Sequence, residues 1–359
     1  MIDLRSDTVT RPTEVMLDAM RVASFGDDAR DGDTTVRRLE GLAAQCTGKE
    51  TAAFMPSGTM TNLVAVLAHA QRGGEILLDA GAHMLNSELG GMSALAGVYY
   101  RAIPGKRGAV DVEELMTAMR PPNRHTLGTT LVCMETSHNS AGGAVLSLQH
   151  MRTVHELAQQ RGIPVHTDGA RVFNAAVALE TSVSSIAQHT DTLCFCISKG
   201  LSAPVGSLLC GSANFIERAR AFRRMVGGNM RQAGLLAAAG VVALETMVDR
   251  LKADHATAKR LASKLHSVDH TLVNPTEVET NIVRVQLPSD GLTATELSND
   301  LRKAGVLVNA CDRNALRFVT HRHIDSADID ETARVFAALL IPSNRKPTGT
   351  GVYPPAEKT

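Results

Sequence analysis

Two kinds of hydrophobic pattern alternate along the first two thirds of the chain. Short apolar runs rich in β-branched residues predict buried strands, and longer segments with apolar residues every three or four positions predict helices. The expected strands lie in residues 75–80, 129–136, 162–169, 191–198 and 206–211, and the clearest expected helices in residues 58–72 and 148–162. This alternation predicts an α/β fold with a mostly parallel sheet sandwiched by helices.

A second unit follows. Residues 234–268 are Ala-rich with a helical period, which predicts a long helical region, and strand patterns recur at residues 280–287, 305–311 and 315–321. We therefore expect a large domain over residues 1–244 and a smaller C-terminal α+β domain over residues 245–342. The proline-rich residues 343–359 have little to bury, and we expect no fixed structure there.

Composition and charge narrow the class of partner. The 37 Lys and Arg residues equal the 37 Asp and Glu residues, so we expect a small-molecule substrate and neither nucleic acid nor an anionic membrane. No signal-peptide pattern and no apolar run of about 18 residues is present, which predicts a cytoplasmic protein. The six cysteines form no C-x-x-C pair, and we expect most of them to be buried free thiols. We assign no metal site.

Two polar residues follow successive expected strands. Asp168 ends the run GIPVHTDG, and Lys199 follows the run DTLCFCIS, 31 residues later. Open α/β sheets bind ligands at the carboxyl ends of their strands. A lysine that forms a Schiff base and a carboxylate that keeps the pyridine nitrogen protonated are what a pyridoxal phosphate enzyme needs. Either residue alone is more typical of an ordinary strand end, and only their joint placement favours the cofactor.

Three further features fit the same cofactor. Ser57, Gly58 and Thr59 precede a helical pattern. Hydroxyls and backbone N–H groups at such a position bind phosphate well, although the same residue types also form an ordinary helix N-cap. His83 follows an expected strand and is placed to stack on a planar ring. Arg171, three residues after Asp168, is placed to reach a phenolic oxygen, although a lone arginine is more often a surface residue.

Six motifs, in order, carry a resemblance to a known family. They read MIDLRSDTVTRPTEVMLDAM, MPSGTMTNL, HTDGARVFNA, SKGLSAPVGSLLCG, GGNMRQAG and LRFVTH. Over about residues 1–335 the chain resembles the low-specificity L-threonine aldolases, which are fold-type I pyridoxal phosphate enzymes. The resemblance implies cleavage of β-hydroxy-α-amino acids into glycine and an aldehyde. It also implies a homotetramer, a dimer of dimers, with active sites between subunits and an N-terminal segment that contributes to them.

The resemblance also implies roles for single residues. Lys199 matches the Schiff-base lysine, Asp168 the partner of the pyridine nitrogen, and Arg171 the residue near the ring hydroxyl. The phosphate loop is matched by Ser57, Gly58 and Thr59, with Arg231 and Arg224 as further phosphate-binding candidates, Arg231 across the subunit interface. The resemblance assigns binding of the substrate carboxylate to Ser6, Arg171 and Arg317, because a planar guanidinium can donate two hydrogen bonds to a carboxylate.

Two histidines are the candidates for the proton transfer. A base must take the β-hydroxyl proton as the aldehyde leaves, and imidazole titrates in the right range. His83 matches the histidine stacked on the ring, and His125, ten residues before Glu135, matches a second active-site histidine. The hypothesis is that His83 and His125 act together.

The chain departs from the family in three places. After the first helix it reads GDDARDGDTTV, which puts Arg30 where a tyrosine from a neighbouring subunit usually lines the site. The run MLNSE after His83 lacks the usual aromatic residues. One interpretation is that both changes open the pocket or favour a polar or acidic substrate side chain. The alternative is that the loop sequence has changed without any effect on function. His323 replaces an acid after LRFVTH, and we expect that change to affect only the surface.

Two other functions are compatible with the same residues. One keeps the cofactor but eliminates from a hydroxy amino acid such as 3-hydroxyaspartate, with Arg30 binding the distal carboxylate. The other is a binding or scaffold protein that retains the fold without catalysis. Product analysis separates the first from an aldolase, and cofactor absorbance at Lys199 separates the second.

Overall fold

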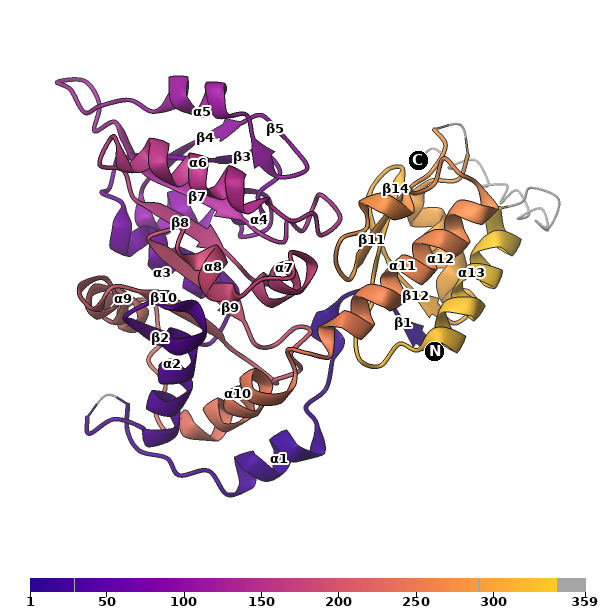
Figure 1. Cartoon of the computed structure of the whole chain (residues 1–359), viewed down its shortest axis with the longest axis horizontal. Coiled ribbons are helices and arrows are strands. Elements are labelled where there is room, and N and C mark those ends of the chain that lie inside the picture. The colour runs from indigo at the N-terminus through magenta and orange to yellow at the C-terminus, as the bar shows by residue number, and fades with distance from the viewer. Residues whose placement is uncertain (29, 290, 341–359) are drawn as a thin grey trace, which may run out of the picture.

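A seven-stranded sheet organises the larger of two lobes (Figure 1). The computed structural model describes residues 1–28, 30–289 and 291–340, and the tail expected over residues 343–359 lies outside them. In order across the sheet the strands are β2 (Thr51–Met55), β10 (Ser207–Gly211), β9 (Thr192–Cys196), β8 (Val165–Asp168), β7 (Thr129–Glu135), β3 (Glu75–Asp79) and β4 (Tyr99–Ile103). Strand β10 is antiparallel to both neighbours and the other pairs are parallel, which confirms the mostly parallel sheet.

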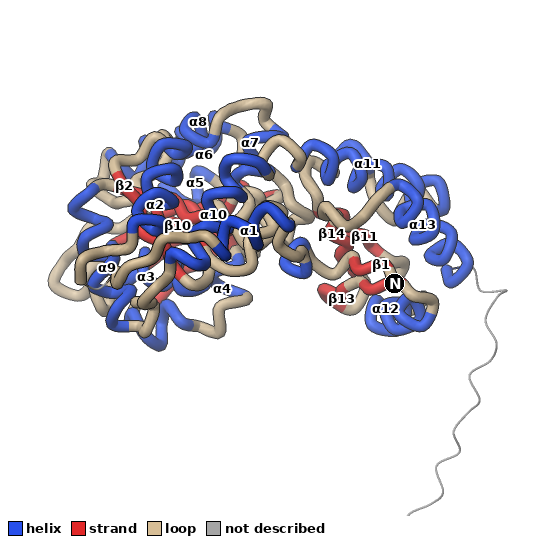
Figure 2. The backbone as a smooth tube through the Cα atoms, turned by 90° about the horizontal axis from the view of Figure 1, so that it is seen from below, coloured by secondary structure: helices blue, strands red, loops and turns tan. Residues whose placement is uncertain are grey.

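Helices cover both faces of this sheet (Figure 2). Alternate residues explain why: in β9, Leu193 and Phe195 join the main core, whereas Cys194 joins the core on the other face. A strand that is apolar on both faces must be covered twice. The helices of this lobe are α1 (Glu14–Arg21), α2 (Thr34–Thr47), α3 (Gly58–His69), α4 (His83–Asn86), α5 (Val112–Ala118), α6 (Leu148–Gln159), α7 (Val172–Ala178), α8 (Val183–Ala187), α9 (Ala213–Met225) and α10 (Gly234–Thr246).

The smaller lobe has a separate hydrophobic core. A three-stranded antiparallel sheet packs there against three helices: β11 (Ile282–Gln286), β14 (Ala315–Val319) and β13 (Asn309–Asp312), with α11 (Leu251–Val268), α12 (Ala294–Lys303) and α13 (Ser326–Leu340). The expected helical region 234–268 is divided, because α10 ends at Thr246 and α11 begins at Leu251.

Short elements complete the described chain. These are the hairpin strands β5 (Gly105–Lys106) and β6 (Ala109–Val110), the 3-10 helices η1 (Asp7–Val9) and η3 (Pro275–Glu277), and the π-helical turn η2 (Met92–Ala96). None of the helices in the described residues is both long enough and apolar enough to cross a membrane.

The chain begins in the smaller lobe and then crosses to the larger one (Figure 1). Strand β1 (Ile2–Asp3) pairs in parallel with β12 (Val306–Leu307), a pairing that the sequence did not predict. The His321 ring also donates through Nε2 to the backbone oxygen of Asp3, at 2.8 Å. These contacts hold the first residues beside the C-terminal sheet, so the segment that follows them passes between the lobes.

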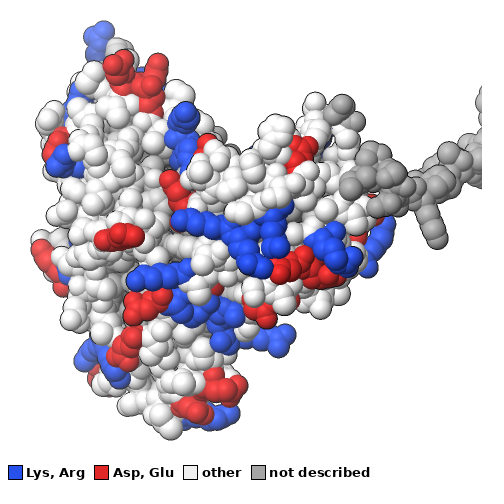
Figure 3. Space-filling model, turned by 45° about the vertical axis from the view of Figure 1, so that its right-hand side comes forward, with Lys and Arg blue, Asp and Glu red and all other residues white. Residues whose placement is uncertain are grey.

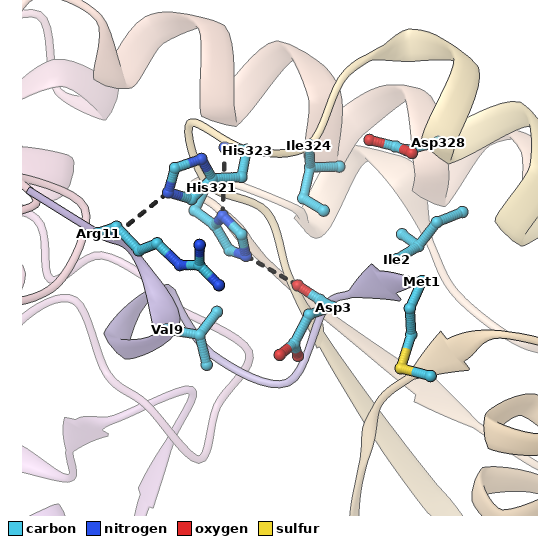
Figure 4. A pocket seen from close by; sticks show the side chains of 9 residues that line it. All are labelled: Met1, Ile2, Asp3, Val9, Arg11, His321, His323, Ile324 and Asp328. Carbon is cyan, nitrogen blue, oxygen red and sulfur yellow. Dashed lines mark hydrogen bonds between the residues drawn. The ribbon is translucent and has the colours of Figure 1, made fainter. Parts of the chain in front are cut away.

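A cavity of about 320 Å³ lies beside this anchor (Figure 4). His323 is exposed there, as expected, but its Nε2 also accepts a hydrogen bond from the backbone N–H of Arg11 at 3.1 Å. The expectation that His323 affects only the surface is therefore incomplete, because the ring helps to hold the N-terminal segment.

Candidate active site

Four parallel strands end at one edge of the large sheet, and the predicted residues meet there. Strand β8 ends at Asp168, and Lys199 lies three residues beyond the end of β9. Strands β3 and β7 end at Asp79 and Glu135 on the same edge. The carboxyl edge of the sheet therefore collects three acids and a lysine, as the strand-end argument predicts.

Asp168 is buried and firmly held. Its Oδ1 accepts from the backbone N–H of Ala170 at 3.0 Å, and its Oδ2 accepts from Asn62 Nδ2 at 2.8 Å. Burial alone would raise the pKa of this carboxyl, but the charges of Lys199 and His83 and the bond from Asn62 hold the pKa below its ordinary value. Asp168 is therefore an anion at neutral pH, the state that a pyridinium partner needs.

Lys199 is half-buried in the loop after β9. Its backbone oxygen accepts from the hydroxyl of Thr10 and from the backbone N–H of Ser202, both at 2.9 Å. Within the described part of the chain its ammonium group enters no ion pair. The backbone is thus pinned while the side chain stays available for chemistry.

The first turn of α3 presents an anion site at the same edge. Ser57 caps this helix, its Oγ accepting from the backbone N–H of Met60 at 3.2 Å, and both Ser57 and Thr59 are exposed. A Cβ on Gly58 would come within 2.8 Å of Cys196 Sγ, so the close packing of helix on sheet requires glycine. Free N–H groups and the helix dipole favour an anion here.

His83 begins α4 beside Asp168. Its backbone N–H donates to Glu135 Oε2 at 2.6 Å, and its Nδ1 lies 3.0 Å from Glu88 Oε1. The hydrogen bond to Glu88 raises the pKa of His83 against the lowering effect of burial. About 31% of the side chain is exposed, so the ring is partly open to solvent while its Nδ1 is held by Glu88.

The structure does not bring His125 into this cluster within one chain. His125 is exposed in the turn that precedes β7, where Arg124 Nε donates to its Nε2 at 2.7 Å. Strand β7 runs for about 20 Å from that end to the carboxyl edge. Joint action of His83 and His125 therefore requires a second copy of the chain.

The N-terminal segment places two arginines at the mouth of the site. Arg171 donates from Nε and Nη2 to the two oxygens of Asp7, at 2.8 and 2.7 Å. Arg317 donates from Nη1 to Asn139 Oδ1 at 2.9 Å and from Nη2 to the backbone oxygen of Arg5 at 3.3 Å, and its buried Nε has no partner in the described structure. Burial and the neighbouring charge of Arg171 lower the pKa of Arg317, and Arg317 has no carboxylate partner among the described residues.

Ser6 precedes Asp7 and caps η1. Its Oγ accepts from the backbone N–H of Thr8 at 3.2 Å. It is half-buried, one residue from the Asp7–Arg171 pair. The three residues predicted for the substrate carboxylate are thus linked to one segment.

The other predicted cations lie elsewhere in the single chain. Arg231 and Arg30 both approach the carboxylate of Asp27, at 3.0 and 3.7 Å, and their side chains are 58% and 79% exposed. Arg224 is exposed near the end of α9. Among the described residues, none of these three is hydrogen-bonded to Asp168 or His83.

Sequence reasoning missed several members of the cluster, notably Asp7, Asn62, Glu88, Glu135 and Asn139. Glu135 was used only as a spacing marker, yet its two oxygens accept from the backbone N–H groups of His83 and Asn139. Asn62 lies four residues after Gly58, one helical turn on, and that spacing is the signal that would have found it.

A cavity of about 330 Å³ opens between the lobes next to Arg317. It is lined also by Ser87, Asn139, Arg284 and Cys311. Figure 3 shows Lys and Arg side chains gathered across the surface where the lobes meet. Two arginines, Arg284 and Arg317, line this cavity, so its charge favours an anionic small molecule.

The cysteines mostly follow expectation. Cys133, Cys194, Cys196 and Cys210 are buried free thiols, whereas Cys46 is half-buried and Cys311 is exposed. Burial raises the pKa of the Cys46 thiol to about 12, so it is unreactive at neutral pH.

Comparison with known proteins agrees with this geometry. Residues 3–288 match the family described as Beta-eliminating lyase. The chain is 40% identical to the low-specificity L-threonine aldolase 1 of Arabidopsis thaliana, covering 95% of this chain and 96% of that one. It is 38% identical to the low specificity L-threonine aldolase of Escherichia coli K12, covering 95% and 99%. A solved structure of a Leishmania major threonine aldolase superposes with a TM-score of 0.81 at 17% identity, over 95% of this chain and the whole of that one, and shows a shared fold.

Proposed function

The chain belongs to the Beta-eliminating lyase family and, within it, is related over nearly its full length to low-specificity L-threonine aldolases, and we propose on this basis that it is a pyridoxal phosphate-dependent aldolase. Its reaction is the cleavage of L-threonine, L-allo-threonine and related β-hydroxy-α-amino acids to glycine and an aldehyde. The observation that carries the proposal is the meeting of Lys199, Asp168 and the first turn of α3 at one sheet edge.

The residues at this edge fit the cofactor. Lys199 has a free ammonium group for the aldehyde, and the ionised Asp168 would hold a proton on the pyridine nitrogen. Ser57, Gly58 and Thr59 would take the phosphate, with Arg231 and Arg224 of another subunit as further cations. When bound, pyridoxal phosphate draws off the electron pair left on Cα as a substrate bond breaks.

The chain's own groups would choose which bond breaks. Arg317, with its unpartnered Nε, would bind the substrate carboxylate, and Ser6 and Arg171 would support it from the N-terminal side. A fixed carboxylate orients the bond between Cα and Cβ relative to the ring plane. Positioning of this kind supplies much of the rate acceleration in such sites.

A histidine would move the proton. His83, beside Asp168, would accept the proton of the β-hydroxyl as the aldehyde leaves. His125 would assist only from a second copy of the chain, since the single chain keeps it at the other end of β7. This requirement agrees with the proposed homotetramer, a dimer of dimers with active sites between subunits.

Exposed apolar side chains support such an assembly. Val22, Phe25 and Leu235 are 83%, 55% and 43% exposed and lie at the adjoining ends of α1 and α10 or just beyond them. Apolar groups gathered on a surface mark an interaction site. We also propose a cytoplasmic location, from the sequence pattern alone.

The eliminating alternative is not favoured, because the named relatives are threonine aldolases. The assignment of Arg30 to a distal carboxylate stays a proposal, and in the single chain Arg30 is paired with Asp27.

Product analysis tests the function. Purified protein is incubated with the isomers of threonine, allo-threonine, phenylserine and 3-hydroxyaspartate, and glycine, aldehyde, ammonia and keto acid are measured. Glycine with aldehyde is expected, and ammonia with a keto acid would overturn the aldolase assignment. Lys199→Ala should abolish both turnover and the cofactor absorbance, whereas Lys303→Ala, on the exposed surface of α12, should leave both unchanged.

A further inference from the structure

Glu88 is a buried acid beside the candidate base, and no motif in the sequence assigns it a role. Its side chain is 3% exposed, and Oε1 lies 3.0 Å from His83 Nδ1. Burial and the charge of Asp168 raise the pKa of Glu88, whereas the hydrogen bonds with His83 and Asn62 lower it. An ionised Glu88 only accepts hydrogen bonds, so the proton of a neutral His83 then lies on Nδ1. The other ring nitrogen, Nε2, is then a bare acceptor.

One amide ties this acid to Asp168. Asn62 Nδ2 donates to Glu88 Oε1 and to Asp168 Oδ2, at 2.8 Å in each case. The reversed amide is disfavoured, because it would set Oδ1 against two carboxylate oxygens, whereas here Oδ1 accepts from the thiol of Cys194 at 3.1 Å and lies 3.2 Å from His166 Nε2. Burial lowers the pKa of His166 to about 4, so that ring is neutral and adds no charge.

The same three side chains also have the composition of a cation site. The ligating atoms of His83, Glu88 and Asp168 lie within 4.8 Å of one another, the one such group of three or more in the described residues. However, the space between the carboxylates is already bridged by the amide hydrogens of Asn62. These amide hydrogens offset the repulsion between the two carboxylates, which is the role that a bound cation would have.

We propose that Glu88 is a positioning residue that fixes His83 with its proton on Nδ1, leaving Nε2 to accept the β-hydroxyl proton of the substrate. The inference rests on the proposed aldol cleavage, since it names how the base of that reaction is prepared. It follows the general arrangement in which a third group orients a catalytic histidine.

The charge of Glu88 acts on the same ring. The acids that face His83 are Glu88 from the turn after α4, Glu135 from β7 and Asp168 from β8, and together they raise its pKa. The base works when His83 is neutral, so turnover should rise as pH rises through that pKa. Removing one of these charges lowers the pKa and moves the rising limb to lower pH.

Two substitutions separate orientation from charge. Glu88→Gln keeps an Oε1 that can accept from His83 and Asn62 but removes the charge, so the rising limb should move down by about one pH unit. Glu88→Ala removes both, and kcat should fall about 10- to 100-fold with little change in KM. Glu88→Asp should recover part of the loss, and Glu113→Gln on the exposed surface of α5 should behave as wild type.

Nitrogen NMR of the full chain labelled at histidine reads the ring directly, with and without cofactor. His83→Asn assigns the signal. In wild type, Nδ1 should carry the proton above the pKa, and Glu88→Gln should lower that pKa. This readout needs no turnover, so it stands even if the wild-type protein releases no glycine, a result that would overturn only the proposed function.

Three results would overturn the role of Glu88. These are a proton on Nε2 of neutral His83 in wild type, an unshifted pH profile in Glu88→Gln, and a stoichiometric divalent metal that copurifies with wild type and is lost in Glu88→Gln. If all three Glu88 variants fail to fold, the wild-type NMR measurement alone tests the proposal.

Discussion

Arg171 and Asp7 lie 164 positions apart in the sequence and meet in a buried two-pronged ion pair, with N–O distances of 2.8 and 2.7 Å. The pair joins the N-terminal segment to the start of α7. It also occupies two of the three guanidinium nitrogens of Arg171, whereas Arg317 beside it has no carboxylate partner. Of the two arginines proposed for the substrate carboxylate, Arg317 is therefore the one whose charge is still available to pair with it.

Asp7→Asn should be strongly destabilising. Removing one partner of a buried pair leaves Arg171 uncompensated, which costs about 3 to 5 kcal/mol of unfolding free energy. Burial would raise the pKa of Asp7, but Arg171 and Lys199 hold it below the ordinary value in the folded state. The pair therefore stabilises above the unfolded pKa of about 3.9, and this stability is lost as pH falls through the lower folded pKa.

Denaturant unfolding at pH 7 and at about pH 2.5, below the unfolded pKa, measures this effect, and the variant should lack the part of the acid-induced loss that Asp7 contributes. Asp18→Asn is the control, because it removes an exposed pair with Arg21 and should change stability little. Equal stability of Asp7→Asn and wild type at pH 7 would contradict the importance of the buried pair.

Arg317→Lys should weaken substrate binding and leave the cofactor in place. Lysine cannot keep both the bond to Asn139 and a two-pronged contact with a carboxylate. KM should rise about 10- to 100-fold, the loss expected for a charged hydrogen bond. Steady-state kinetics with threonine measure KM, and absorbance confirms cofactor binding. Arg313→Lys, in the exposed turn between β13 and β14, is the matched control, and an equal KM in both variants argues against this role.

Local patterns explain what could be predicted from the sequence. Asp168 and Lys199 each follow an apolar run, and parallel strands bring their carboxyl ends together, so two local patterns and one general rule locate both. Glu88 was not predictable, because its contacts with Asn62 and Asp168 depend on how α3 packs on the sheet. Strand β1 has two residues and shows no periodicity. His125 matched by spacing alone, and spacing does not say which subunit supplies a side chain.

Mixing two inactive variants tests whether active sites are shared. Lys199→Ala keeps His125, and His125→Asn keeps Lys199. If His125 acts on a neighbouring subunit's site, refolding the two variants together should restore about a quarter of wild-type turnover, because half of the pairs are hybrids with one complete site. Lys199→Ala mixed with His83→Asn should stay inactive, because Lys199 and His83 of one chain both lie near the same Asp168. Full activity of His125→Asn alone contradicts the shared role.

Ser87→Phe should narrow the cavity beside Arg317. Ser87 lines this space of about 330 Å³ and belongs to the run MLNSE that follows His83. The ratio of kcat/KM for phenylserine to that for threonine should fall about tenfold, because the pocket would lose room for a ring. Ser87→Ala keeps the space and should leave the ratio unchanged. An unchanged ratio in Ser87→Phe means that the substrate side chain lies elsewhere.

Ser202→Gly should stabilise the cofactor-free protein. Ser202 has φ of +65°, is fully buried, and its Oγ has no partner in the described structure. The left-handed conformation costs a non-glycine residue about 1 to 2 kcal/mol, and an unpaired buried hydroxyl costs a similar amount. Against this stands the larger entropy of glycine in the unfolded chain, about 0.5 to 1 kcal/mol. A net gain of about 1 to 2 kcal/mol should appear in denaturant unfolding.

Glu180→Gly separates the two contributions to that gain. Glu180 also has a left-handed backbone, with φ of +52°, but it is exposed, so its replacement relieves the backbone and removes no buried hydroxyl. Its gain should be smaller than that of Ser202→Gly. Because the Ser202 N–H donates to the backbone oxygen of Lys199, cofactor affinity should be measured in parallel. A loss of stability in cofactor-free Ser202→Gly contradicts the prediction, since it would mean that the hydroxyl stabilises the folded loop.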